Sequence, residues 1–195
     1  MKKLENYTPF TALNSSAAPE NSASSRKYTV PEKPEMEKMD HMPKEVLVLG
    51  HCLLNPIARV KGAKPASPVD PKGANVIQLP CPESMFLGMR RREITKDQLD
   101  HPSYRRFCRK IFAPLADMLE DLAANGINIR IIGVPKSPSC GVRITSIGGE
   151  PGKSKEFHHS HAQEPGVFME EIIKELKKRG VKFEIEDAEV KGKTF

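Results

Sequence analysis

Three short segments of the 195-residue chain each place a cysteine beside proline, glycine or a small polar residue. They are Gly-His-Cys-Leu-Leu-Asn-Pro around Cys52, Leu-Pro-Cys-Pro-Glu-Ser around Cys81 and Pro-Lys-Ser-Pro-Ser-Cys-Gly around Cys140. Each segment follows an apolar run that is typical of a buried strand. Because strand ends in an open α/β sheet meet at one crevice, we expect the three thiols to lie close together.

Three thiolates at one crevice suit an iron–sulfur cluster that is held at three corners, with one iron left open. Such an iron is a Lewis acid that can bind a substrate sulfur, as a catalytic zinc site keeps one coordination position free. Two other interpretations stay open, namely buried cysteines without a role and a structural zinc with His51 as a neighbouring ligand. Cys108 lies inside a predicted helix and is interpreted as a helix-packing or semi-exposed thiol rather than a ligand.

The elements that position these cysteines follow from apolar patterns. Runs of apolar or alternating residues predict strands at residues 46–49, 76–79, 127–134 and 181–186, the last nearer a sheet edge. Helical spacing predicts helices at 104–122 and 166–179. In the first helix, Asp100 is the expected N-cap, Asn125-Gly126 the expected end, and Pro114 the expected site of a kink.

The order of these elements predicts an α/β fold with a mostly parallel sheet of about four strands. The connection between Cys52 and Asn75 is rich in proline and shows no clear helix, so a parallel pairing of the first two strands needs an irregular crossover. Residues 1–42 are rich in Ser, Ala, Pro, Glu and Lys and predict a flexible or surface-draped arm. Residues 43–195 form the predicted folded domain.

Composition narrows the class of protein. The net charge is +6, which is a mild excess, and no stretch approaches the about 20 apolar residues of a membrane span. The first residues carry no apolar run typical of a secretory signal, so we expect a cytoplasmic protein without a membrane partner. In a reducing compartment the four cysteines are better interpreted as metal ligands or reactive thiols than as disulfides.

The cysteine segments, in this order, resemble the DUF523 family, which includes the thiouracil desulfidases. The closer similarity is to a desulfidase-related subgroup of anaerobic bacteria and archaea, through Gly-His-Cys-Leu-Leu-Asn-Pro and through residues 78–83, 104–110 and 132–142. The resemblance covers about residues 45–190. The chain departs from the better-known members at residues 58–62, where they continue toward Arg-Tyr-Asp-Gly, and at residues 84–88, where it lacks their Gly-Gly.

This resemblance implies a Rossmann-like three-layer α/β domain that carries a [4Fe-4S] cluster on Cys52, Cys81 and Cys140. The implied activity removes sulfur from a small thiolated compound such as thiouracil and releases sulfide. By motif position, the implied catalytic residues are Glu83 and Ser137. Both departures from the family pattern line the presumed pocket, so the sequence leaves the substrate open.

As a hypothesis, Glu83 takes a proton from an attacking water, and Ser137 holds that water or steers the substrate. The alternative for Glu83 is a carboxylate at a helix N-terminus after Pro82. The alternative for Ser137 and Ser139 is hydrogen bonding within a turn, and for Ser139 this turn role is the favoured interpretation.

Two further clusters are interpreted as solvated surface. His158, His159 and His161 could bind a metal, but they lie in a loop rich in Gly, Lys and Glu. Arginines at 90–92, 105, 106 and 109, together with Lys110, could bind phosphate or RNA, but aromatic residues are sparse and nucleic acid is disfavoured. We expect these basic residues to be partly paired with acids such as Glu93 and Asp97. The alternatives to a desulfidase are therefore a non-catalytic sulfur or metal carrier, and then an RNA-associated factor.

Overall fold

The computed structural model describes residues 44–60, 71, 73–149 and 160–189. All of them belong to one compact unit, residues 41–195. The arm predicted over residues 1–42 lies outside the described residues.

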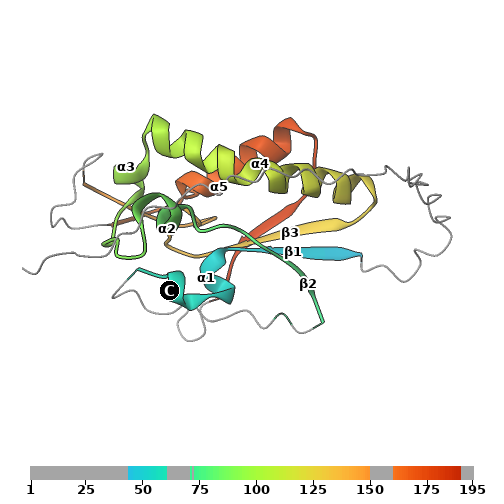
Figure 1. Cartoon of the computed structure of the whole chain (residues 1–195), viewed down its shortest axis with the longest axis horizontal. Coiled ribbons are helices and arrows are strands. Elements are labelled where there is room, and N and C mark those ends of the chain that lie inside the picture. The colour runs from blue at the N-terminus through green and yellow to red at the C-terminus, as the bar shows by residue number, and fades with distance from the viewer. Residues whose placement is uncertain (1–43, 61–70, 72, 150–159, 190–195) are drawn as a thin grey trace, which may run out of the picture. The chain divides into compact units, whose positions relative to one another are not determined.

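Four parallel strands form the central sheet in the order β2-β1-β3-β6 (Figure 1). The strands are β1 (Glu45–Leu49), β2 (Asn75–Gln78), β3 (Asn128–Gly133) and β6 (Glu184–Asp187). Leu47 of β1 lies opposite Val76 of β2 and Arg130 of β3, which fixes the register on both sides. All four strands were predicted from their apolar runs, and the edge position expected for the last strand is confirmed.

Two long helices cover one face of this sheet. In Figure 1, α4 (Pro102–Ala124) and α5 (Val167–Lys178) lie side by side above the strands, and the short α1 (His51–Leu54) and η2 (Pro56–Ala58) lie below them. The rings of Phe112 and Phe168 meet edge to face, with centroids 6.2 Å apart. The architecture is therefore the predicted Rossmann-like three-layer α/β fold.

The start of α4 differs from the prediction. His101 is the N-cap, and its Nδ1 accepts a hydrogen bond from the backbone N–H of Tyr104. Asp100 instead binds the guanidinium of Arg105. A short helix that ends at residue 99 occupies the preceding turn, so Asp100 cannot begin α4.

The end of α4 agrees with the prediction, because Asn125 is its C-cap and Gly126 has a φ of 79°. The helix continues through Pro114. Its buried face is rotated from the predicted one, because Met118 is exposed and Cys108, which was not on the predicted face, is fully buried. Cys108 is therefore a packing thiol and not a semi-exposed one.

Several short elements were not predicted, because none is long enough to show a period. They are α1, η2, α2 (Pro82–Leu87), α3 (Lys96–Leu99) and an antiparallel pair of strands, β4 (Thr145–Ile147) and β5 (Ser160–Ala162). Both α1 and η2 lie in the connection between β1 and β2, which is the irregular crossover that the parallel pairing required.

Within the described ranges, no helix combines the length and the apolar character that crossing a membrane would need.

The carboxyl ends of β1 and β3 are joined to the cysteine segments by short backbone contacts. Gly50 donates its N–H to the carbonyl of Ile132 at 3.0 Å, and Val134 donates to the carbonyl of Cys140 at 2.8 Å. A Cβ atom at Gly133 would lie 2.5 Å from that same Cys140 oxygen. Gly133 is therefore needed for the loop that carries Cys140 to fold back onto β3.

We predict that Gly133→Ala lowers the free energy of unfolding by about 1 to 3 kcal/mol, because the added methyl group displaces backbone. Gly50→Ala is the control, since its added Cβ would meet a side-chain methyl of Val134 at 3.0 Å, while the nearest backbone atom, the oxygen of Ile132, is at an ordinary contact distance of 3.6 Å. Denaturant unfolding of both variants measures the difference. Equal losses in the two variants would contradict the proposed role of the close backbone contact.

Candidate functional site

The three cysteines of the sequence motifs follow three neighbouring strands of the sheet. Cys52 lies in α1 directly after β1, Cys81 is the N-cap of α2 after β2, and Cys140 lies in the loop after β3. Because β1 lies between β2 and β3, the three segments are adjacent at one edge. In a sheet with this order, the β1/β3 boundary is the topological switch point at which ligands bind.

The three thiols interact with one another. Cys52 and Cys81 are hydrogen-bonded through their side chains, and the charge of Cys140 acts on Cys52 while that of Cys81 acts on Cys140. Cys81 and Cys140 are 6% and 7% exposed, while Cys52 is half-buried. The fold therefore brings all three sulfur atoms into one electrostatically coupled group.

Hydrogen bonds between the ends of β1 and β2 hold Cys52 beside Cys81. His51 Nδ1 lies 3.3 Å from the carbonyl oxygen of Leu79, and Gln78 donates to the carbonyl of His51 at 3.2 Å. A carbonyl oxygen only accepts, so Nδ1 of His51 carries the proton. His51 therefore acts as a link between the two segments.

Two side chains, those of Ser137 and Asp187, fix the loop that carries Cys140. The hydroxyl of Ser137 accepts the backbone N–H of Cys140 at 3.0 Å and that of Ser139 at 3.3 Å. The carboxylate of Asp187, at the end of β6, accepts the N–H groups of Val142 and Arg143 at 2.7 and 2.8 Å. These bonds give Cys140 a defined backbone position before anything binds.

A buried ion pair lies beside the cysteines. Glu83, in the first turn of α2, accepts a hydrogen bond from Nε of Arg91 at 3.1 Å. Nη2 of Arg91 donates to the carbonyl of Ala58 at 2.6 Å and lies 3.9 Å from the sulfur of Cys81. Burial raises the pKa of Glu83, and the charge of Arg91 acts in the opposite direction. Glu83 thus combines burial, a cationic partner and proximity to a thiol.

A chain of hydroxyl groups continues from Glu83 into the core. Ser139 hydrogen-bonds to the carboxylate of Glu83, and its Oγ lies 2.8 Å from the phenol oxygen of Tyr104. A carboxylate accepts only, so Ser139 donates to Glu83 and accepts from Tyr104. The sequence interpretation of the two serines is therefore wrong in one respect: the turn role favoured for Ser139 is performed by Ser137, and Ser139 contacts Glu83.

Arg91 and Tyr104 are contacts that the sequence did not single out as site residues. Arg91 was part of a basic run interpreted as solvated surface, yet its side chain is 3% exposed, whereas Arg90 and Arg92 are exposed. No periodic signal distinguishes the middle residue of such a run. Tyr104 lies in the motif at residues 104–110, but its role was assigned to the helix core alone.

The protonation of the thiols is uneven. Hydrogen bonds from Cys52 and Ser84, together with the charge of Arg91, lower the pKa of Cys81 to about 5, although burial opposes them. The same pairing with Cys81, together with burial, raises the pKa of Cys52. Burial also raises the pKa of Cys140. One thiolate and two thiols therefore occupy the site near neutral pH.

The donor set at the three strand ends consists of three sulfur atoms. Among the described residues, no group of three or more His, Cys, Asp or Glu side chains is already arranged to hold a metal ion. Cysteine thiolates are the usual ligands of iron–sulfur clusters and are also ligands of structural zinc, so the three thiols fit either group in type. Because Cys52 and Cys81 are hydrogen-bonded to each other, these two sulfur atoms would have to move apart to occupy separate corners of a four-iron cluster.

Cys108 differs from the other cysteines. It is fully buried inside α4, and burial raises its pKa to about 12. A thiol that stays protonated in the core is neither a ready ligand nor a nucleophile.

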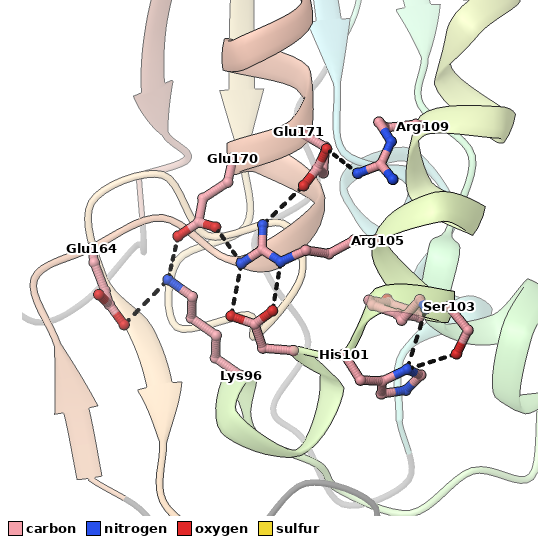
Figure 2. Close-up of polar contacts among 10 residues, drawn as sticks. Lys96, His101, Ser103, Arg105, Arg109, Glu164, Glu170 and Glu171 are labelled. Carbon is pink, nitrogen blue, oxygen red and sulfur yellow. Dashed lines mark hydrogen bonds and ion pairs between the residues drawn. The ribbon is translucent and has the colours of Figure 1, made fainter.

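The predicted basic region is largely neutralised by acidic side chains. Figure 2 shows Arg105 between Glu170 and Glu171, with bonds of 2.8 and 2.9 Å, and Arg109 bound to Glu171 at 2.8 Å. Asp100 is a third acidic partner of Arg105. The expectation that acids pair with part of the basic region is therefore confirmed for Arg105 and Arg109, but the acids are not the ones that were named as examples. These ion pairs hold α4 against α5.

Two cavities lie along α4. One, of about 450 Å³, is lined by Asp100, His101, Pro102, Arg105, Arg106 and Arg109. The other, of about 220 Å³, is lined by Arg109, Phe112, Ala113, Glu171 and Glu175. Neither lining includes one of the three cysteines.

The histidine cluster is only partly described. His158 and His159 lie outside the described residues, while His161 lies in β5 opposite Ser146.

Comparisons with known proteins give a relative without an assigned function. The chain is similar to the uncharacterized protein MJ0003 of Methanocaldococcus jannaschii, with 26% identity over 151 residues that cover 71% of this chain and 81% of that protein. No protein-family model matches the chain. No solved structure matches it. The chemistry of the site must therefore be argued from its residues.

We predict that the metal-free protein forms one thiolate as the pH rises through about 5, because Cys81 is stabilised in its charged form. The ultraviolet absorbance of the thiolate, followed against pH, measures this step. Cys81→Ser should abolish the step, and Cys52→Ala should move it to higher pH by removing a donor. Cys108→Ser is the control and should leave it in place. Ionisation of every thiol only near the ordinary pKa of 9.0 would refute the uneven protonation.

Proposed function

We propose that this protein is an iron–sulfur-dependent desulfidase that removes sulfur from a small thiolated compound and releases sulfide. The observation that carries the proposal is the meeting of Cys52, Cys81 and Cys140 at the ends of three adjacent parallel strands. The sequence resemblance to the DUF523 family, which rests on the same three segments, adds support. The reaction replaces the thiocarbonyl sulfur with the oxygen of water, without net oxidation or reduction.

In this proposal the three cysteines hold a [4Fe-4S] cluster. When bound, the cluster supplies an iron with an open coordination position, which is a Lewis acid for a soft sulfur atom. The protein supplies the thiolates, the shape of the site and the groups that move protons.

Glu83 is the residue best placed to act as a general base. Its buried carboxylate has a raised pKa, which brings its basicity closer to neutral pH than that of an exposed carboxylate. Arg91 and Ser139 hold it from two sides, so its orientation does not depend on the substrate. In its ionised form it accepts a proton from the attacking water, and it returns that proton to the departing sulfur.

Ser137 fits a positioning role better than direct chemistry. Its hydroxyl oxygen accepts two backbone N–H groups of the loop that carries Cys140. The hydroxyl proton also interacts with the sulfur of Cys140. We assign Ser137 to holding Cys140 in place.

The second candidate is a non-catalytic sulfur or metal carrier, which would use the same three cysteines as ligands. The two candidates differ in whether the loaded protein turns over a thiolated compound.

We predict that anaerobic reconstitution gives four irons per chain, with visible absorption, and that the loaded protein releases sulfide from 2-thiouracil or a related compound. Single replacement of Cys52, Cys81 or Cys140 by Ala should remove most of the iron, because each is one of three ligands. Cys108→Ala is the control and should keep it. Iron that survives all three ligand replacements would exclude the cluster assignment, and a loaded protein without turnover would favour the carrier.

We predict that Glu83→Gln keeps the cluster but lowers the rate of sulfide release by about 10²- to 10⁴-fold, because the amide cannot accept the proton. In the parent protein, the rate should rise as the pH passes through the raised pKa of Glu83, and this limb should vanish in the variant. The exposed Glu93→Gln is the control. An unchanged rate and pH profile in Glu83→Gln would remove Glu83 from the mechanism.

A further inference from the structure

Two arginines near the cysteines bury guanidinium groups whose hydrogen-bonding capacity is not used. Nη1 of Arg91, and both Nε and Nη1 of Arg59, are buried without a hydrogen-bond partner among the described residues. Buried donors of this kind are rare in folded proteins, since each one forfeits its hydrogen bonds to water. Unused donors on two charged side chains therefore point to a missing acceptor.

The two arginines belong to one group of segments. Nη2 of Arg91 donates to the carbonyl of Ala58, the residue that directly precedes Arg59. Ala58 ends η2, which continues from the helix that contains Cys52. Arg91 also contacts Cys81 and Glu83. Both arginines thus belong to segments that adjoin those of two of the three cysteines.

Arg91 already has two anionic neighbours, the carboxylate of Glu83 and the sulfur of Cys81. The unused N–H groups of Arg59 and Arg91, rather than an excess of positive charge, are what call for a further acceptor. A guanidinium recognises oxyanions best, because its planar N–H groups match carboxylate and phosphate oxygens.

We propose that Arg59 and Arg91 form an oxyanion subsite that binds a carboxylate or phosphate carried by the thiolated substrate. The inference rests on the proposed function, because it places the anionic group of the substrate beside the cysteines. It makes anionic thio compounds the preferred substrates and uncharged 2-thiouracil a substrate that binds more weakly. The exposed arginines on either side of Arg91 take no part in the subsite.

Isothermal titration of the full-length protein tests the subsite. Two ring compounds are compared, 2-thiouracil and 2-thiouracil-6-carboxylate, with inorganic phosphate as a third probe. Both the metal-free and the anaerobically reconstituted protein are titrated. We expect the carboxylate compound to bind at least about tenfold more tightly than 2-thiouracil in both forms, because one charge-assisted hydrogen bond contributes enough free energy for such a difference in affinity.

Arg59→Gln should reduce this preference to near parity while leaving the Arg91–Glu83 pair intact. Arg91→Lys keeps the charge but removes the planar donors, and it should weaken the preference as well. Arg92→Gln is the matched control from the same run, since its side chain is exposed, and it should change nothing.

Several outcomes would overturn the subsite. They are equal binding of the two ring compounds, a preference that survives in both variants, and no binding of the carboxylate compound by either form. A preference that disappears on reconstitution would mean that the cluster itself satisfies the arginines. Tight phosphate binding without a preference between the ring compounds would indicate a free anion instead. Iron content and sulfide release test the proposed function independently of the subsite, because the preference for the carboxylate compound is also measured in metal-free protein.

Discussion

Parallel pairing of β1 with strands on both of its sides is the constraint on which the site depends. The ladder continues to the ends of the strands, where Leu79 donates its N–H to Leu49 at 2.8 Å and Gly50 donates to Ile132 at 3.0 Å. A slip of one residue would turn the buried side chains of β1 to the wrong face. Register, and with it the meeting of Cys52, Cys81 and Cys140, is therefore fixed by the apolar core rather than by the cysteines.

The buried ion pair of Glu83 and Arg91 is not explained by its contribution to folding stability. Desolvation of the two charges offsets much of their attraction, and a well-packed apolar pair would stabilise the fold equally well. The ion pair has two effects that an apolar pair would lack. Arg91 joins α2 to η2 through the carbonyl of Ala58, and it places positive charge beside the sulfur of Cys81. This combination is typical of a site arranged for charge rather than for packing.

The sequence predicted those features that a local pattern records. The strands at residues 46–49 and 127–134 are apolar and β-branched, so local propensity and burial agree, and the order of strands and helices then determines a parallel sheet. The buried face of α4 is rotated from the predicted one, because Met118 and Cys108 both fit the helical spacing of apolar residues and only Cys108 is buried. The residue types of the helix alone do not show which of the two faces packs against α5 and the sheet.

The contacts of the site were harder to predict, because they join residues that are distant in the chain. Nothing local distinguishes Arg91 from Arg90 and Arg92, and only the fold buries one and exposes the others. The two serines of Ser-Pro-Ser-Cys also look equivalent in sequence. Their roles separate only because α2 brings Glu83 to Ser139, while Ser137 faces the backbone of its own loop.

The uneven protonation of the thiols explains why cationic side chains are needed here. In the metal-free state one thiolate, at Cys81, is stabilised by the proton that Cys52 retains. In the proposed loaded state all three sulfur atoms are deprotonated, so Cys52 and Cys140 would release protons as the site is filled. The positive charge of the bound iron would offset these lost protons, which leaves a net negative charge in a region with little water. Arg91, already in contact with Cys81, counters this negative charge, and its further N–H group leaves capacity for one more anion beside the cysteines.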